Sequence, residues 1–189
     1  MSLPLGIQIS TKVAYMGRGA HIISFFQKEG SEMYEYLQKF RITKEEIGNV
    51  PTNENVFLPV TQDEIGPAEI ALGMAFPGAL RSFYSEVGYG FLLQGINGDM
   101  AQELNRILHP DQVCDCVNQG DSGLEVGDLP VFEATYGSFF VMRPRSDTPD
   151  ALFIPGFETP LEISFTNFVR RLYFESPNFY WDLIRKRLL

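Results

Sequence analysis

Histidine, cysteine and long apolar runs are scarce in this chain of 189 residues. Its two histidines are His21 and His109, and its two cysteines, Cys114 and Cys116, are separated by a single aspartate. A disulfide closing so small a loop would be strained, and a zinc site needs about four ligands, which no cluster of these residues supplies. We therefore expect two reduced thiols, and neither a metal nor a cofactor.

No apolar run approaches the roughly 20 residues that a membrane-spanning helix needs. The N-terminus also lacks the charged region followed by a long apolar core that marks a signal peptide. Hydrophobic residues nevertheless make up 44% of the chain, which is enough to bury a sizeable core. These features predict a folded, cytoplasmic protein without membrane contacts.

Motifs of catalysis and phosphate binding are missing as well. The serines lack a G-x-S-x-G elbow, and the cysteines lack a recognisable catalytic signature. The Gly88-Tyr89-Gly90 segment does not have the third glycine of a dinucleotide-binding motif. It also comes after a predicted helix, whereas that motif comes after a strand. The His-Pro-Asp tripeptide at residues 109–111 matches that of J domains, but an acidic segment follows it, so we interpret Pro110 as a helix start.

Without such motifs, we expect a binding protein. The alternative, a small-molecule enzyme or sensor, requires a deep polar pocket with shifted titratable groups.

Basic residues are few where acidic residues are many. Residues 111–162 contain ten acidic residues and two arginines, which places −8 of the net charge of −9 in this region. Such a region repels nucleic acid and attracts basic partners. A well-solvated surface without a partner is the alternative reading of the same charge.

Apolar residues recur at helical spacing in several segments, and capping residues mark where these begin. Thr61 and Glu64 are spaced as a capping box for a helix that carries Ile65, Ile70 and Met74. The predicted helices are residues 31–40, 61–74, 77–87, 99–108, 110–117, 164–172 and 181–188.

Strand-like runs occupy the middle of the chain, and Tyr136 with Gly137 suits a tight hairpin turn. The predicted strands are residues 89–93, 129–135, 138–143, 151–154 and 160–163. Grouped strands predict an α+β fold, with N-terminal helices, a central antiparallel meander and C-terminal helices packed on the sheet. Residues 49–59 are expected to be a linker, so residues 1–60 form an N-terminal helical extension and residues 61–189 form the α+β domain.

Six short motifs, in this order, resemble the SUKH superfamily, which includes bacterial immunity proteins and a fungal regulator of cell-wall synthesis. Phe76 stands where this superfamily most often has leucine, and Gly88-Tyr89-Gly90 stands where Asn-Gly-Gly is usual. The resemblance covers roughly residues 61–175. Its motifs are EIALG (69–73), FPGALRSFY (76–84), VGYG (87–90), LPVF (129–132), YGSFFV (136–141) and SFTNFV (164–169).

The resemblance implies an α+β fold without catalytic residues. It also implies a protein that binds and neutralises a toxin domain, often one that attacks nucleic acid. A regulatory scaffold of the cell-wall-regulator type is the alternative function. An acidic region suits a basic toxin domain, because complementary charge speeds association. The partner-binding residues that we expect are Asp111, Asp115, Asp121, Glu125, Asp128 and Glu133.

Overall fold

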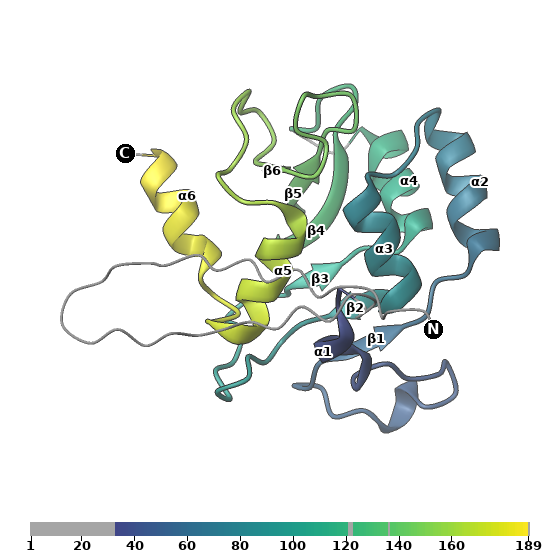
Figure 1. Ribbon diagram of the computed structural model, residues 1–189, viewed down its shortest axis with the longest axis vertical. Coiled ribbons are helices and arrows are strands. Elements are labelled where there is room, and N and C mark those ends of the chain that lie inside the picture. The colour runs from purple at the N-terminus through teal and green to yellow at the C-terminus, as the bar shows by residue number, and fades with distance from the viewer. Residues whose placement is uncertain (1–32, 121–122, 136, 189) are drawn as a thin grey trace, which may run out of the picture.

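The computed structural model describes residues 33–120, 123–135 and 137–188 (Figure 1). The helices are α1 (Glu35–Gln38), the 3-10 helix η1 (Ile47–Asn49), α2 (Gln62–Leu72), α3 (Gly78–Glu86), α4 (Pro110–Gln119), α5 (Phe165–Phe174) and α6 (Tyr180–Leu188). The strands are β1 (Val56–Leu58), β2 (Tyr89–Phe91), β3 (Arg106–Ile107), β4 (Leu129–Thr135), β5 (Ser138–Met142) and β6 (Leu152–Phe153). Each strand pairs antiparallel with the next one in the chain. The predicted α+β fold with a central meander and flanking helices is confirmed.

Helix α2 begins at the predicted capping box. The main-chain N–H of Thr61 donates to Glu64 Oε2 at 2.7 Å, and the helix ends at Gly73 in a left-handed conformation. Ile65 is buried as predicted, but Ile70 is 82% exposed. Five residues rotate a side chain by about 140° around a helix at 100° per residue. Ile70 therefore lies off the stripe of Ile65, although the predicted helix carries both residues.

Helix α3 follows Pro77 and buries Leu80, Phe83 and Tyr84 completely, as the sequence predicts. Gly88, just beyond its end, has a φ of +116°, and a Cβ there would lie 1.9 Å from the carbonyl oxygen of Leu58. Only glycine therefore lets β1 run this close to the chain that enters β2.

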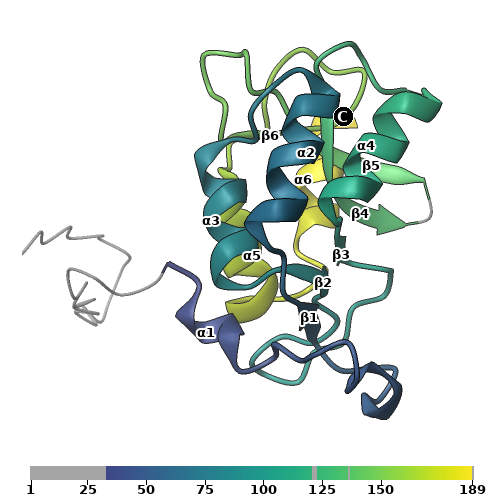
Figure 2. The same cartoon turned by 90° about the vertical axis from the view of Figure 1, so that its right-hand side faces the viewer.

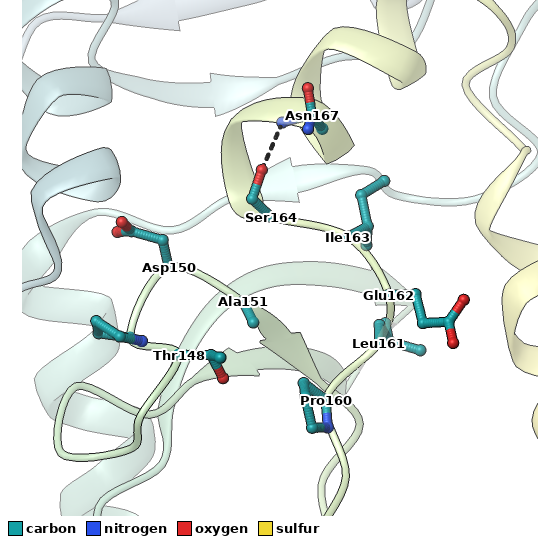
Figure 3. A pocket seen from close by; sticks show the side chains of 10 residues that line it. Thr148, Asp150, Ala151, Pro160, Leu161, Glu162, Ile163, Ser164 and Asn167 are labelled. Atoms are coloured by element: carbon teal, nitrogen blue, oxygen red, sulfur yellow. Dashed lines mark hydrogen bonds between the residues drawn. The ribbon is translucent and has the colours of Figure 1, made fainter.

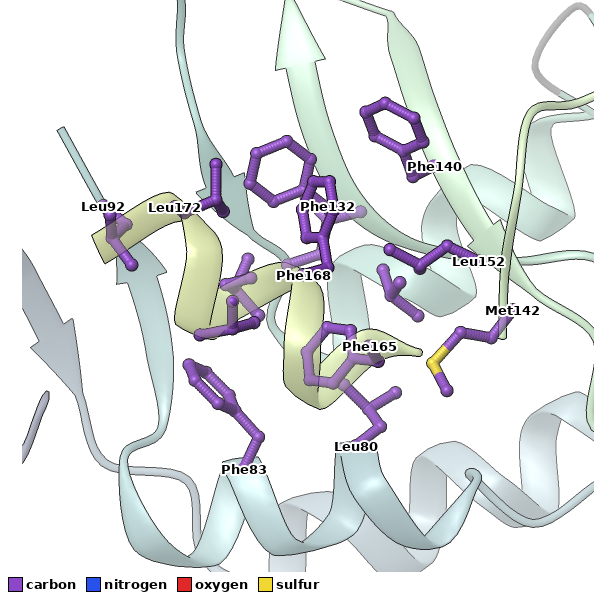
Figure 4. Close-up of a cluster of buried hydrophobic side chains, with 14 of the residues drawn as sticks. Leu80, Phe83, Leu92, Phe132, Phe140, Met142, Leu152, Phe165, Phe168 and Leu172 are labelled. Atoms are coloured by element: carbon purple, nitrogen blue, oxygen red, sulfur yellow. The ribbon is translucent and has the colours of Figure 1, made fainter. Parts of the chain in front are cut away.

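The core lies between the sheet and helices α3 and α5, which cover one side of it (Figures 2 and 4). The Phe132 ring of β4 packs edge-on against the Phe168 ring of α5, with centroids 4.9 Å apart. Phe83 of α3 packs in the same way against Phe165 at 5.6 Å. The predicted helical stripe of α5 is thus the main apolar face, and Ser164 caps it by accepting from the N–H of Asn167.

Three elements of the structure differ from those predicted from the sequence. Residues 99–108 are not a helix, because Leu104 and Leu108 donate main-chain hydrogen bonds to the carbonyls of Ala134 and Val131 in β4. A strand, β3, is needed here to join β2 to β4, and sheet pairing overrides the helical spacing. Residues 49–59 are not only a linker, since β1 lies within them. Residues 160–163 run beside β6, where Leu152 donates to the carbonyl of Ile163 and accepts from the N–H of Leu161, but no strand forms there.

The residues before position 60 that the structure describes pack into the same core. Tyr34 and Leu37 are completely buried, and the main-chain N–H of Tyr34 donates to Glu86 Oε2 at 2.7 Å. Of the predicted helix at residues 31–40, the four residues of α1 are helical, and Ser31 lies outside the described residues. Tyr136 of the predicted hairpin turn also lies outside them. Across the described ranges, no helix has the length and apolar character needed to cross a membrane.

Candidate functional site

Glu133, one of the six predicted partner-binding residues, is engaged within the sheet. Its side chain is 6% exposed and forms an ion pair with Arg106 of β3. Its other oxygen accepts from the N–H of Gly137 at 3.1 Å, which holds the hairpin between β4 and β5. The register places this ion pair within one row of side chains across a single face of the sheet. That row consists of Val56, Phe91, Arg106, Glu133 and Phe139.

Asp128 is also buried, with 1% of its side chain exposed. Its Oδ1 accepts from Nε of Arg143 at 2.6 Å, and Nη2 of Arg143 lies 3.3 Å from Glu125 Oε2. The Arg143 guanidinium also donates to the carbonyl of Phe157 and lies over the ring of Phe153. The hydrogen bond to Asp128 raises the pKa of Arg143. Asp128 therefore ties the loop that enters β4 to the loop that leaves β5, at the end of this pair opposite the hairpin turn, while Glu125 is 53% exposed.

Asp111 and Asp115 lie four residues apart on α4 and are both exposed. Pro110 is the first residue of this helix, as predicted, and His109 caps it by accepting from the N–H of Asp111 through Nδ1. Asp121, just beyond the end of α4, lies outside the described residues. The structure thus separates the six predicted residues: two are buried in ion pairs, two are exposed on α4, and Glu125 lies in the following loop.

Helix α2 lies beside α4 and runs parallel to it. His109 Nε2, at the start of α4, lies 3.5 Å from Glu64 Oε1 at the start of α2. One to two turns later, the Cys114 thiol donates to the carbonyl of Ala68 at 3.6 Å. Burial, followed by the nearby charges of Asp111 and Asp115, raises the pKa of the Cys114 thiol. Cys114 thus packs between the helices, and the carboxylates lie outside this contact.

The outward faces of α2 and α4 form one acidic surface, which we call the acidic helix surface. The two helices contain five carboxylates and neither lysine nor arginine. Glu69 is paired with Arg81 at 3.1 Å. Within the described residues, Asp63, Asp111 and Asp115 form no ion pair with a lysine or arginine. The acidic helix surface consists of the exposed stripes Asp63, Pro67, Ile70 and Asp111, Asp115, Asn118.

Ile70 is the large apolar residue of this surface. At 82% exposure it is, after Val126, the most exposed large hydrophobic residue in the described ranges. A single exposed apolar side chain is ordinary, but one that shares an exposed helix face with the carboxylate of Asp63 suits the mixture of apolar and polar groups in a protein interface. The sequence contains a pattern that could have predicted this exposed stripe of α2. Asp63, Pro67 and Ile70 follow the i, i+4, i+7 spacing of one helix face, as Asp111, Asp115 and Asn118 do on α4.

A pocket of about 430 Å³ lies beside the start of α5 (Figure 3). Its polar groups serve mainly as helix caps: Ser164 Oγ accepts from the N–H of Asn167, and Asp150 Oδ1 accepts from the N–H of Ala79 at the start of α3. Four tyrosines have a pKa raised mainly by burial, and these do not line the pocket; they are Tyr34, Tyr36, Tyr84 and Tyr180. Among the described residues, no three His, Cys, Asp or Glu side chains are grouped to hold a metal ion.

Comparison with known proteins gives one informative relative. The immunity protein YxxD of Bacillus subtilis (strain 168) is 30% identical over 142 residues, which cover 69% of this chain and 91% of YxxD. No protein-family model matches the chain. No solved structure matches it either. With this identity and nearly the whole of YxxD covered, the chain belongs to the family of the immunity protein YxxD.

Proposed function

We propose that this chain is a non-enzymatic, cytoplasmic immunity protein of the SUKH type, which binds a cognate toxin domain and blocks it. The relationship to an immunity protein supports the general role. The observation that supports this mode of binding is the acidic helix surface, on which Asp63, Asp111 and Asp115 are exposed and have no lysine or arginine partner in the part of the chain that the structure describes.

The negative charge of the acidic helix surface suits a toxin domain that binds nucleic acid. A toxin domain that acts on nucleic acid needs basic side chains to hold the phosphate backbone. An acidic protein surface competes for the same side chains, and it steers the two proteins together at low salt. Ile70, at the C-terminal end of the α2 stripe, would then be desolvated on contact and slow dissociation.

The partner to be tested is the protein encoded by the reading frame next to that of this chain. Co-expression should restore growth of cells that produce the toxin, and the two proteins should co-purify. Reversal of three charges (Asp63→Lys, Asp111→Lys and Asp115→Lys) should lower the association rate at low salt by about tenfold or more and flatten its salt dependence.

The matched control reverses three exposed carboxylates elsewhere, at Glu35, Glu175 and Asp182. This control changes the net charge equally, so it should have the smaller effect on association. Equal effects of the two triple variants would show that net charge, and not the acidic helix surface, governs binding. Failure of the wild-type protein to bind or protect would overturn the proposed function itself.

A further inference from the structure

An apolar groove of about 520 Å³ lies over β1 and β2, on the sheet face that carries the Val56–Phe91 pair. The segment around η1 forms one wall, and the chain that leads into β3 forms the other. Ile47, on the η1 wall, is 54% exposed. The apolar residues that line the groove are Ile47, Val50, Val56, Phe91, Leu93 and Leu104.

Hydrogen bonds to main-chain groups support the shape of this apolar groove. Buried Asn55 donates from Nδ2 to the carbonyl of Gln94 at 2.7 Å and accepts from the N–H of Gln94 through Oδ1 at 2.8 Å. Leu104, on the other wall, donates to the carbonyl of Ala134 in β4 at 3.0 Å. The sheet thus holds the Leu104 wall, and Asn55 ties the end of the segment that carries η1 to Gln94, so an occupant would meet a largely preformed site.

The two charged residues that line the groove are both acidic, and Arg106, next to Phe91 in the sheet, is paired with Glu133. Glu54 and Glu103 line it and are exposed, and none of its lining residues is Lys, Arg or His. An apolar floor beside two carboxylates suits an apolar side chain carried by a basic segment. An acidic segment would place like charges side by side, which is unfavourable.

The groove adjoins the acidic helix surface. Tyr89 and Phe91 lie two residues apart on β2, so their side chains share a face of the sheet. The Tyr89 ring packs edge-on against the ring of His109, with centroids 4.6 Å apart. His109 is the N-cap of α4, directly before Asp111. One face therefore runs from the groove, over Tyr89 and His109, to the first carboxylates of α4.

We propose that the apolar groove is the second half of the toxin-binding surface. It receives one or two apolar side chains from a segment of the toxin domain whose Lys or Arg residues contact Glu54 and Glu103. This inference rests on the proposed function, because the occupant is the same basic toxin domain. The acidic helix surface governs the rate of association, and the groove governs the rate of dissociation.

The test measures dissociation rates from the toxin encoded by the adjacent reading frame. Ile47→Ala removes one wall of the groove, and its matched control is Ile96→Ala, at a residue that is 52% exposed and does not line the groove. Glu54→Lys with Glu103→Lys reverses the groove charges, with Glu45→Lys as the control in the same segment. Ile47→Ala and the charge reversal should each speed dissociation by about tenfold, and the controls by less than about twofold.

Each outcome identifies the statement that fails. If the wild-type protein binds, the charge-reversed acidic helix surface weakens binding and the groove variants behave as wild type, the groove proposal is overturned and the proposed function stands. If the wild-type protein does not bind the toxin, both are overturned. Unchanged thermal unfolding of the groove variants would exclude a general loss of folding as the cause of weaker binding.

Discussion

His109 Nε2 lies 3.5 Å from Glu64 Oε1, so the first turns of α4 and α2 meet at the acidic helix surface. Glu64 also accepts from the main-chain N–H of Thr61, and this hydrogen bond is the largest cause that lowers its pKa below the usual 4.5. A carboxyl with a lowered pKa in the folded state stabilises the fold above its unfolded pKa. That contribution is lost as the pH falls through the folded pKa.

Glu64→Gln should therefore reduce the acid sensitivity of the protein. Glutamine also suits the third helical position of a capping box, so the variant should lose less than about 1 kcal/mol at pH 7. Glutamine does not titrate, so the free energy of unfolding should fall less steeply between pH 5 and pH 3 than in the wild-type protein. Urea unfolding at a series of pH values measures this, and identical slopes for both proteins would contradict it.

Asp128 and Glu125 contact the same guanidinium, that of Arg143, but with different burial. Asp128→Ala leaves a nearly buried Arg143 without its main partner and should cost about 3–5 kcal/mol of unfolding free energy. Glu125→Ala removes an exposed partner and should cost less than about 1 kcal/mol. Chemical denaturation of both variants tests this difference. A small loss for Asp128→Ala would mean that its carboxylate is not part of the support for the β4–β5 loops.

The elements with strong local signals were predictable from the sequence. Thr61 and Ser164 mark helix starts by their own hydrogen bonds, and β4 is long enough to be recognised with the same bounds as observed. Strand β3 has only two residues and β1 only three. Segments this short show no alternation of apolar and polar residues, so the sequence does not predict them, and their conformation depends on pairing with neighbouring strands.

The candidate site was predictable only in part for a related reason. Asp111 and Asp115 come after a helix start that His109 and Pro110 define. They lie four residues apart on one face of α4, so the helix itself predicts that both are exposed. Glu133 meets Arg106 across 27 positions of sequence, and this pair depends on the register of the sheet. The acidic composition was visible in the sequence, but not the pairing that removes two of its carboxylates from the surface.

Gly88→Ala should strongly destabilise the fold, because its Cβ would lie 1.9 Å from the carbonyl oxygen of Leu58 and its φ is +116°. The matched control is Gly78→Ala, at the first residue of α3, where a Cβ meets no atom within 4 Å apart from its chain neighbours and its own helix backbone. Alanine is the better helix former, so this control should gain about 0.5–1 kcal/mol. Thermal unfolding should separate the two variants in opposite directions. Equal melting temperatures would contradict the close approach of β1 to Gly88.

Ile70→Asp should weaken toxin binding without loss of stability. The side chain is 82% exposed, so its replacement should change the free energy of unfolding by less than about 0.5 kcal/mol. Ile65→Ala, on the buried side of the same helix, should cost about 2–5 kcal/mol. If Ile70 is the apolar centre of the interface, aspartate there should raise the dissociation constant by about tenfold or more, although it adds a negative charge that favours a basic partner. Tighter binding by Ile70→Asp would instead mean that charge alone governs recognition at this surface.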